Sequence, residues 1–397
     1  MPEQATLPPS APHHGAPGHR PPRLLVELLA RADVRFDGGR PWDVQVHHPR
    51  LYRRLLTRWS LGAGESYMDG DWDCERLDEL FARLMQVDLD QVAPGWSRLA
   101  AGWEWLRHRL FNLQSLRRAF QVGEQHYDVG NDVFEAMLDT RLVYSCAYWE
   151  RARTLEQAQV DKLELICRKL QLQPGERLLD IGCGWGGLAR HAALHHGAQV
   201  TGITVSREQL ALAQQRCAGL PVDLRLMDYR ALAETGARFD KIASVGMFEH
   251  VGPKNYATYL DTAGQLLAPE GVFLLHTIGS GTTTPFTDPW IDRYVFPNGK
   301  LPSARELAQA LEGRFVIEDW HNFGPDYDRT LMCWHQRFEA AWPRLSARYD
   351  ERFRRLWRYY LLCCAGFFRS RQGQLWQLVL THRERARPYR SVRFAGA

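Results

Sequence analysis

The sequence has no hydrophobic run long enough to form a membrane-spanning helix. Its densest apolar stretch, residues 359–368, is about half of the roughly 20 residues that such a helix needs. The 8 cysteines form no C-x-x-C pair and show no zinc-binding spacing. The start of the chain also lacks the pattern of a secretory signal peptide. We therefore expect a cytoplasmic protein with reduced thiols, and we expect no metal site.

The chain has little net charge, +4 at pH 7, although that charge is unevenly distributed. Residues 348–393 contain twelve arginines, no lysine and three acidic residues, and aromatic residues are interleaved with the arginines. Arginines flanked by aromatic rings suit an anionic lipid surface or a nucleic acid. A solvated helix face over a hydrophobic core predicts the same pattern, so both interpretations stay open.

The length and composition indicate a globular protein with more than one domain. A chain of 397 residues exceeds what a single core usually supports, and 45% apolar with 24% charged residues is ordinary. Residues 1–22 include seven prolines and are expected to form a disordered tail. We place an N-terminal domain, which ends in an amphipathic connector, at 23–118 and a second domain at 119–397.

The N-terminal domain is predicted to be mostly helical. Apolar spacing predicts one helix at 49–59 and another at 76–85. It also predicts a hairpin whose two arms are 34–36 and 42–46. Gly62 and Gly64 are interpreted as a break after the first helix. Tryptophan and leucine residues lie among arginines through 93–118, and we therefore expect that connector to be amphipathic.

A glycine-rich stretch at 178–187, L-L-D-I-G-C-G-W-G-G, organises the second domain. An apolar run ends at Asp180 and Ile181 and is followed by four glycines, which predicts a buried strand, a tight turn and a helix start. Free N–H groups at such a helix start face a polar or anionic ligand. The glycines match the dinucleotide fingerprint G-x-G-x-x-G. They also match D-x-G-x-G-x-G, which resembles the first motif of S-adenosylmethionine-dependent methyltransferases. A glycine-rich turn without a ligand is the third interpretation.

Strands and helices alternate after this turn. Four more strands are predicted, at 199–204, 222–227, 239–245 and 272–276. A helix is predicted at 256–267 and a turn at 269–271. Two further helices are predicted to open with capping boxes, formed by Thr154 with Gln157 and by Ser206 with Gln209. Repeated strand–helix units predict an α/β fold whose parallel sheet is covered by helices on both faces.

Polar residues follow the predicted strands, at the edge where parallel α/β sheets bind their ligands. We expect these residues to converge: Asp180, Thr204, Asp228, Glu249 and His276. A buried carboxylate such as Glu249, near the imidazole of His276, can hold a proton, a cation or an anion. A contact at a helix N-terminus is the alternative for Glu249. A core histidine with satisfied hydrogen bonds is the alternative for His276.

Aromatic residues are concentrated in Y-S-C-A-Y-W, residues 144–149, a stretch without helical periodicity. We interpret it as a loop or lid over a pocket. The candidates for the walls of that pocket are Tyr144, Tyr148, Trp149 and Tyr327. Aromatic ring faces of this kind attract a sulfonium ion or a carbocation.

Eight stretches of the sequence resemble the cyclopropane-fatty-acyl-phospholipid synthase family. They are E-S-Y-M-D-G (65–70), H-Y-D-V-G-N-D (126–132), Y-S-C-A-Y-W (144–149), L-L-D-I-G-C-G-W-G-G-L (178–188), S-V-G-M-F-E-H-V-G-P-K-N-Y (244–256), L-H-T-I-G-S (275–280), F-P-N-G (296–299) and E-D-W-H-N-F-G-P-D-Y-D (318–328). The resemblance covers about 45–393, and because several stretches are long it is specific.

The resemblance implies a fold and an activity. The fold is the Rossmann-like seven-stranded sheet of class I methyltransferases, with helices on both faces, preceded by a smaller, mostly helical domain that engages lipid. The activity is transfer of a methylene group from S-adenosylmethionine to the cis double bond of an unsaturated phospholipid acyl chain. The alkene attacks the sulfonium methyl group, and a bound bicarbonate then removes a proton so that a cyclopropane ring closes. A homodimer is also implied, peripheral to the inner face of the membrane, whose lipid binding weakens with salt.

The resemblance further assigns site residues. The ligands of the bicarbonate would be Cys146, Glu249, His276, Tyr327 and the backbone of Ile278. The residues around S-adenosylmethionine would be Tyr144, Ser145, Asp180, Gly182, Gly184, Thr204, Gln209, Asp228 and Tyr229. The two glycines would approach the methionine part, and the last two residues would flank the adenine. Cys364 also matches the family, although an inert buried thiol is the better interpretation of it.

Several alternatives stay open. The same site suits a C-methyltransferase that gives methyl-branched acyl groups, or a small-molecule N-methyltransferase. A non-catalytic lipid-binding relative would predict eroded glycines or a lost Glu249, and the sequence shows neither. Nucleic-acid methylation is disfavoured because no D/N-P-P-Y/F motif occurs, so we expect no nucleic-acid partner.

Overall fold

The computed structural model describes residues 20–87, 130–284 and 287–393. The predicted connector at 93–118 and the predicted start of the second domain at 119 lie outside these residues. Most of the predicted tail at 1–22 also lies outside them.

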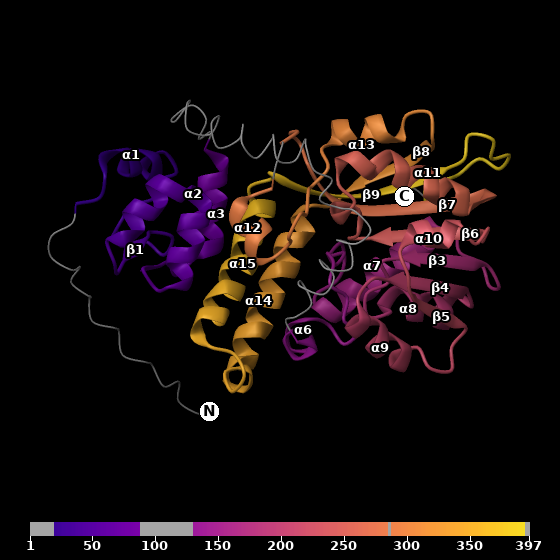
Figure 1. The fold of residues 1–397 in the computed structure, drawn as a ribbon, viewed down its shortest axis with the longest axis horizontal. Helices are drawn as coiled ribbons and strands as arrows, with labels where there is room; N and C mark the ends of the chain where they lie inside the picture. The colour runs from indigo at the N-terminus through magenta and orange to yellow at the C-terminus, as the bar shows by residue number, and fades with distance from the viewer. Residues whose placement is uncertain (1–19, 88–129, 285–286, 394–397) are drawn as a thin grey trace.

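A seven-stranded sheet lies at the centre of the second domain (Figure 1). Its strands are β3 (Arg177–Ile181), β4 (Gln199–Thr204), β5 (Val222–Leu226), β6 (Phe239–Val245), β7 (Leu267–Ser280), β8 (Val316–Asn322) and β9 (Gly373–Thr381). The spatial order is β5-β4-β3-β6-β7-β9-β8. The pairs from β5 to β7 are parallel, whereas β9 runs antiparallel to both β7 and β8. The predicted seven-stranded α/β sheet is confirmed, and the two predictions at 199–204 and 239–245 match strands to the residue.

Helices cover both faces of the sheet because successive strand residues point to opposite sides. Leu178 packs on one side, with α7 (Leu155–Lys169) and α8 (Gly187–His196). Its neighbour Leu179 packs on the other side, with α11 (Tyr256–Leu266) and α13 (Ala304–Leu311). Two shorter helices complete the outer layer, α9 (Arg207–Arg216) beside β4 and β5 and α10 (Tyr229–Ala233) beside α11.

One local prediction for this domain is wrong in detail. Residues 269–271 do not form a turn between helix and strand but lie within β7. Its pairing with β6 shifts register there, from Phe239 opposite Leu267 to Lys241 opposite Val272, so the Pro-Glu-Gly is accommodated as an irregularity of the strand.

The two predicted capping boxes are half formed. Thr154 and Ser206 do accept hydrogen bonds from the backbone N–H groups of Gln157 and Gln209, at 3.3 Å each. The return contacts are replaced, because the Gln157 side chain donates to Asp161 and the Gln209 side chain accepts from Thr204. In each of these two helices the N-cap side chain therefore satisfies one backbone N–H group of the first turn, and the reciprocal bond of a capping box is absent.

The N-terminal domain contains α1 (Arg23–Arg31), α2 (Arg50–Met68), α3 (Leu77–Gln86) and a two-stranded sheet of β1 (Gln45–Val46) and β2 (Trp72–Asp73). The two predicted helices are present, but the predicted hairpin is wrong. Strand β1 pairs antiparallel with β2 rather than with 34–36. The two expected arms meet at a single isolated bridge, between Phe36 and Val44.

The predicted glycine break in this domain is also misplaced. The backbone of α2 departs from helical geometry at Trp59, whose φ is 43°, while Gly62 and Gly64 lie within the helix. A Cβ on Gly62 would come within 2.2 Å of the Arg54 carbonyl oxygen, and one on Gly64 within 2.3 Å of the Trp290 indole. These glycines therefore permit close packing rather than ending the helix.

Four helices join the two parts of the protein: α6 (Asn131–Met137), α12 (Pro289–Tyr294), α14 (Pro325–Leu345) and α15 (Glu351–Arg369). Helix α15 packs against α2 and α3 on one side and against α14 on the other (Figure 1). One hydrophobic cluster accordingly contains Leu77 and Leu80 from the N-terminal domain together with Trp334 and Trp357. None of the helices in the described ranges is both long enough and apolar enough to cross a membrane.

The arginines of α15 have protein partners, which favours the structural interpretation of the basic segment 348–393. Arg355 pairs with Asp73 at 2.7 Å, and Arg352 pairs with Asp69 at 3.2 Å. Arg369 pairs with Asp328 of α14 at 2.9 Å and also with Asp78 of α3. These ion pairs connect α15 to the N-terminal domain and to α14, so an open stripe of arginines for headgroups is not found on this helix.

We expect Gly366→Ala, in α15, to destabilise the protein. The added Cβ would lie 2.6 Å from Phe81 Cβ and 2.8 Å from the backbone nitrogen of Ala82 in α3. Because a backbone atom cannot yield without moving α3, we expect a loss of about 1–3 kcal/mol in the free energy of unfolding. Denaturant unfolding measures this loss.

Gly264→Ala is the matched control, since this glycine lies in α11 and its added Cβ would meet no atom closer than 3.5 Å. We expect no loss there, because alanine favours a helix over glycine by up to about 1 kcal/mol. Equal losses in the two variants would contradict the packing argument.

Candidate active site

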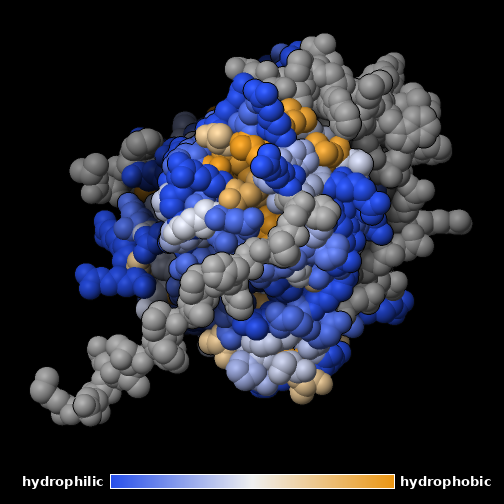
Figure 2. Space-filling view, turned by 90° about the vertical axis from the view of Figure 1, so that its left-hand side faces the viewer, coloured by the Kyte–Doolittle hydropathy of each residue, from blue (hydrophilic) through white to orange (hydrophobic). Residues whose placement is uncertain are grey.

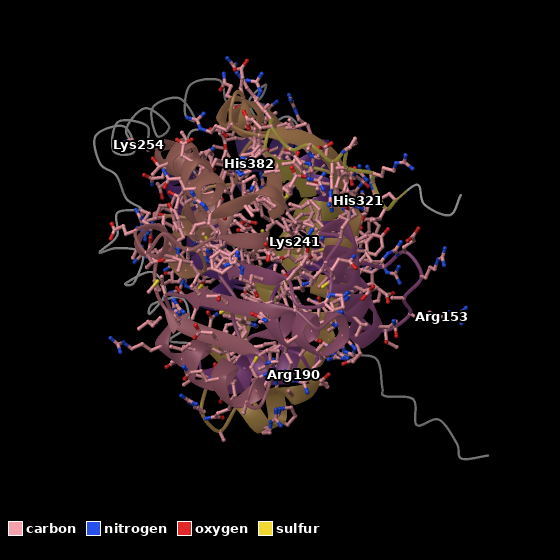
Figure 3. All side chains as sticks on the ribbon, turned by 90° about the vertical axis from the view of Figure 1, so that its right-hand side faces the viewer. Arg153, Arg190, Lys241, Lys254, His321 and His382 are labelled. Atoms are coloured by element: carbon pink, nitrogen blue, oxygen red, sulfur yellow. The ribbon has the colours of Figure 1, made fainter. Side chains whose placement is uncertain are left out.

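The predicted site residues lie at the carboxyl edge of the sheet, which faces α14 and α15 (Figure 1). Trp185, after β3, and Ile278, near the end of β7, belong to the same hydrophobic cluster as Trp334 and Trp357 of those helices. The other edge is seen in Figure 3, where Lys241, near the start of β6, lies at the centre of the view. The site is therefore enclosed between the sheet and the helix pair.

The glycine loop after β3 has the geometry of a ligand cradle. Gly182 and Gly184 have φ angles of 83° and 54°, which L side chains rarely adopt. A Cβ on Gly184 would meet no described atom within 4 Å, whereas one on Gly182 would lie 3.0 Å from Met247. The backbone of this loop therefore borders open space at the N-terminus of α8, where unpaired N–H groups gather.

A buried lysine stands beside this loop. Lys162 of α7 is 1% exposed, and its Nζ donates to Ser145 Oγ at 2.9 Å. Burial lowers the pKa of Lys162 to about 8, partly opposed by the carboxylate of Asp139. Burial likewise raises the pKa of Asp180 to about 7, which the charge of Lys162 opposes. Oδ2 of Asp180 has no hydrogen-bond partner within the described residues, so this carboxyl can still accept a donor from a ligand.

Three of the predicted residues at the ends of β4 and β5 already have hydrogen-bond partners within the protein. Thr204 Oγ1 donates to Gln209 Oε1 at 3.0 Å, and both residues are buried. Asp228 accepts from both Nε and Nη2 of Arg230, at 2.8 and 2.9 Å. Tyr229 is buried, with its ring 5.0 Å from that of Tyr259. The roles of these residues toward a nucleotide stay predictions.

Glu249 is the most unusual group at this edge. It lies in a short 3-10 helix after β6 and is 8% exposed, and its Oε1 accepts from the Ile278 backbone N–H at 2.7 Å. The other oxygen, Oε2, is buried and has no hydrogen-bond partner among the described residues. Burial raises the pKa of Glu249 to about 7, and the Ile278 N–H opposes that rise. A free acceptor with an intermediate pKa can hold or receive a proton near neutral pH.

His276 is oriented by a glutamine that sequence reasoning missed. It is 1% exposed on β7, and its Nδ1 lies 3.2 Å from Nε2 of the buried Gln377 on β9. In the tautomer in which the amide donates to Nδ1, the ring proton lies on Nε2, which can then donate to an anion. Burial lowers the pKa of His276 well below its usual range, and the charges of Lys162 and Lys169 add to this effect. The histidine is therefore neutral.

The remaining predicted anion ligands also meet at this edge. Cys146 and Tyr327 share a small apolar cluster with Ile278, Phe323 and Leu375. Burial raises the pKa of both the Cys146 thiol and the Tyr327 phenol well above their usual ranges, so both stay protonated. All five predicted anion ligands are brought together in this way, since Glu249 bonds Ile278 and the ring of His276 lies 5.9 Å from that of Phe323.

The aromatic stretch 144–149 is a loop, and its aromatic rings differ in how available they are to a cation in the pocket. The Tyr144 hydroxyl lies 2.7 Å from that of Tyr360, and its ring lies 5.3 Å from Trp334. The Trp149 ring already carries the guanidinium of Arg329, at 4.4 Å from its centroid. Trp149 is therefore less suited to a cation in the pocket than Tyr144 or Tyr327. Burial raises the pKa of Cys364 to about 12, which fits an inert thiol.

Comparisons with known proteins identify the family. The family model for mycolic acid cyclopropane synthetase matches residues 114–378. The chain is 53% identical over 363 residues to the cyclopropane-fatty-acyl-phospholipid synthase of Escherichia coli K12, covering 90% of this chain and 93% of that protein. The chain belongs to this cyclopropane synthase family. A probable fatty acid methyltransferase of Pseudomonas putida is 42% identical over 266 residues, 64% of this chain and 67% of that protein.

The solved structures of this family support the same assignment. A mycolic acid cyclopropane synthase complexed with SAH and CTAB superposes with a TM-score of 0.61 at 32% identity. The superposition covers 66% of this chain and 97% of that one. The protein is thus a homologue of the cyclopropane-fatty-acyl-phospholipid synthases and an S-adenosylmethionine-dependent enzyme of the methyltransferase class. The glycine cradle fits such a cofactor, and so does Asp180 Oδ2, which has no hydrogen-bond partner among the described residues.

Lys162 and Gln377 are the two residues at this cyclopropane-synthase site that sequence reasoning missed. Lys162 lies inside a helix and Gln377 inside a strand, and neither belongs to a recognisable motif. Their polar groups become significant because both residues are at most 1% exposed. For Gln377 the signal in the sequence is a polar residue among apolar neighbours, W-Q-L-V-L at 376–380, whereas Lys162 lies among other charged residues, V-D-K-L-E at 160–164.

We expect Glu249→Gln to be more stable than the parent protein above neutral pH. The pKa of Glu249 is raised from 4.5 to about 7, so folding favours the protonated form. The stability that this group contributes is therefore complete below pH 4.5 and is lost as the pH rises through 7. Glutamine accepts from the Ile278 N–H but does not ionise, so the gain grows across this window to at most about 3 kcal/mol.

Denaturant unfolding at about pH 5 and about pH 8 measures this difference. Glu312→Gln, at an exposed position on the end of α13, is the control and should show no such change with pH. A pH-independent difference between Glu249→Gln and the parent protein would contradict the raised pKa.

Proposed function

We propose that this enzyme transfers a methylene group from S-adenosylmethionine to the cis double bond of an unsaturated phospholipid acyl chain, forming a cyclopropane ring. The observation that carries the proposal is the buried Glu249 carboxyl, bonded through one oxygen to Ile278 and unpaired at the other within the described residues. Next to it lie the neutral His276 and the protonated Tyr327 and Cys146. Such a set can hold a small anion that itself carries a proton.

The relatives support this choice of substrate. The protein that shares 53% identity over 90% of the sequence is named for an acyl phospholipid, and the match includes most of the N-terminal domain. Figure 2 views that domain and shows hydrophobic side chains surrounded by hydrophilic ones. The exposed apolar residues of the domain include Leu24 and Val26 on α1, which are 42% and 43% exposed. We include in the proposal that this domain engages lipid at the inner face of the membrane and that the enzyme is a homodimer.

The glycine cradle would hold the methyl donor. S-adenosylmethionine supplies an electrophilic sulfonium methyl group. The backbone at Gly182 and Gly184 leaves room for its methionine part, and Ser145, held by Lys162, would accept or donate at its polar end. Thr204 and Gln209 would face the ribose as a hydrogen-bonded pair. The binding of the donor in one orientation lowers the entropic part of the barrier.

The anion held at Glu249 would be bicarbonate, which supplies a base of moderate strength. Glu249 Oε2 would accept the O–H of this anion, because that oxygen has no protein partner among the described residues. His276 Nε2 and the Tyr327 hydroxyl would donate to its oxygens. Holding the base by hydrogen bonds from neutral groups keeps it near the place where the proton is released.

Aromatic and apolar side chains would protect the cationic stage of the reaction from water. Tyr327 packs against Phe368 at 4.6 Å and Trp334 at 6.0 Å between ring centroids. Tyr144 packs against Phe134 at 5.1 Å and Trp334 at 5.3 Å. Ring faces attract a carbocation, and the exclusion of water prevents its capture as an alcohol.

We expect the purified enzyme to convert vesicles of a cis-monounsaturated phospholipid in the presence of S-adenosylmethionine. Lipid mass spectrometry should show a gain of one CH2 per acyl chain, and proton NMR should show the high-field signals of ring protons. A methyl-branched or methylene product with no ring protons would instead favour a C-methyltransferase of acyl groups, the activity suggested by the relative from Pseudomonas putida. Confirmed cofactor binding without any mass gain would overturn the phospholipid substrate.

We expect Glu249→Gln to bind S-adenosylmethionine but to lose at least about a hundredfold in turnover, the usual scale for a positioned acid–base group. Glutamine keeps the bond to Ile278 but presents no carboxylate to a bicarbonate O–H. Calorimetry of cofactor binding and the vesicle assay separate the two effects, and the exposed Glu312→Gln should have parental turnover.

The parent enzyme, depleted of bicarbonate by degassing, should regain activity when bicarbonate is added. Indifference to bicarbonate, together with an inactive Glu249→Gln variant, would mean that Glu249 acts as the base itself. Parental turnover in Glu249→Gln would remove this residue from the mechanism.

A further inference from the structure

A second cluster of ligating side chains lies away from the active site, between α7 and α8. Cys167, His191 and His196 each place a potential ligand atom within 4.8 Å of the other two. Glu164 joins them from the preceding turn of α7, with Oε2 3.0 Å from His196 Nε2 and 3.4 Å from His191 Nε2. Thiolate, imidazole and carboxylate are the ligands that zinc takes in proteins.

The packing of two helices brings these residues together. Glu164 and Cys167 are three apart on α7, so they lie on one face of that helix. His191 lies in the middle of α8 and His196 is its last residue, and α8 packs beside α7. The four residues belong to no zinc-binding sequence pattern because the set is assembled by the packing of two helices, and sequence reasoning therefore missed it.

The hydrogen bonds of this cluster are incomplete without a further ligand. His191 is 6% exposed, and its Nδ1 has no hydrogen-bond partner in the part of the protein that the structure describes. Cys167 is fully buried. Tetrahedral zinc with bonds of about 2.0–2.3 Å places its ligand atoms roughly 3.3–3.8 Å apart. The distances between the ligand atoms, now within 4.8 Å, would therefore shorten when the ion binds.

An ion can reach this cluster from the surface. The side chains of Glu164 and His196 are 42% and 17% exposed, whereas Cys167 and His191 form the inner side. Arg190, labelled in Figure 3, precedes His191 and marks where α8 lies on that side of the molecule. The outer pair would therefore meet the ion first and the inner pair would complete its coordination.

We propose that Glu164, Cys167, His191 and His196 bind one zinc ion that ties α7 to α8. The thiol of Cys167 loses its proton to solvent as the Zn–S bond forms, and the metal remains divalent throughout. Helix α7 carries Lys162 and follows the loop 144–149, and α8 begins at the glycine cradle. The ion would thus fix the two helices that hold the cofactor site, and its role would be structural.

The test uses the full-length protein, treated with a chelator, kept reduced and then given zinc or cobalt. We expect one zinc per protein molecule by elemental analysis after dialysis, and a higher melting temperature with zinc than without. Cobalt should give a near-ultraviolet thiolate charge-transfer band and strong visible bands typical of tetrahedral coordination. Cys167→Ala should abolish the charge-transfer band, and His196→Asn, at the partly exposed position, should weaken zinc binding more than tenfold.

Two variants provide matched controls. His195→Asn removes an exposed histidine whose ring lies 4.6 Å from that of His191, and Cys333→Ala removes a thiol on α14. Both should bind zinc like the parent protein. Zinc binding that survives both Cys167→Ala and His196→Asn, or that is lost in either control instead, would overturn the assignment. The absence of a cobalt–thiolate band in the parent protein would also overturn it.

Discussion

The exclusion of water from the carboxyl edge of the sheet is the constraint on which the active site depends. Glu249 accepts a hydrogen bond from the Ile278 backbone, and burial raises its pKa to about 7 in spite of that bond. Exposed to water, both oxygens of the same carboxyl would be hydrated, and Oε2 would not be free to accept a hydrogen bond from a bound group. The apolar cluster that contains its partner Ile278 therefore determines its chemistry as much as the carboxyl does.

The helix pair α14–α15 creates this exclusion and also joins the two parts of the protein. Trp334 and Trp357 cover the sheet edge, while the opposite side of α15 packs against α3 and forms ion pairs with Asp73 and Asp78. A displacement of the N-terminal domain would therefore also move the helices that cover the active site. The N-terminal domain, for which we propose a contact with lipid, thus packs against the same helix pair that covers the active site.

The residue pattern located the strands β3 to β7, because β3, β4 and β6 are almost wholly buried apolar runs. Strands β8 and β9 were implied only by the family resemblance. The residue pattern also located the polar residues at the strand ends, since the carboxyl ends of parallel strands meet at one edge. It failed where tertiary contacts decide. Gly62 and Gly64 resemble a helix break until the positions of Arg54 and Trp290 are known, and the strand at 45–46 pairs with a segment that follows a whole helix.

The energetics of the buried ionisable groups at this edge could not be predicted from the sequence either. Lys162, Asp180 and His276 are each at most 2% exposed, and each would be costly to bury alone. Their burial together costs less, because the positive charge of the lysine offsets part of the desolvation cost of the ionised aspartate and because the histidine remains neutral. No single residue type in the sequence signals this balance. It arises from the distances between α7, β3 and β7, and it means that the site is a coupled unit whose members cannot be assessed one at a time.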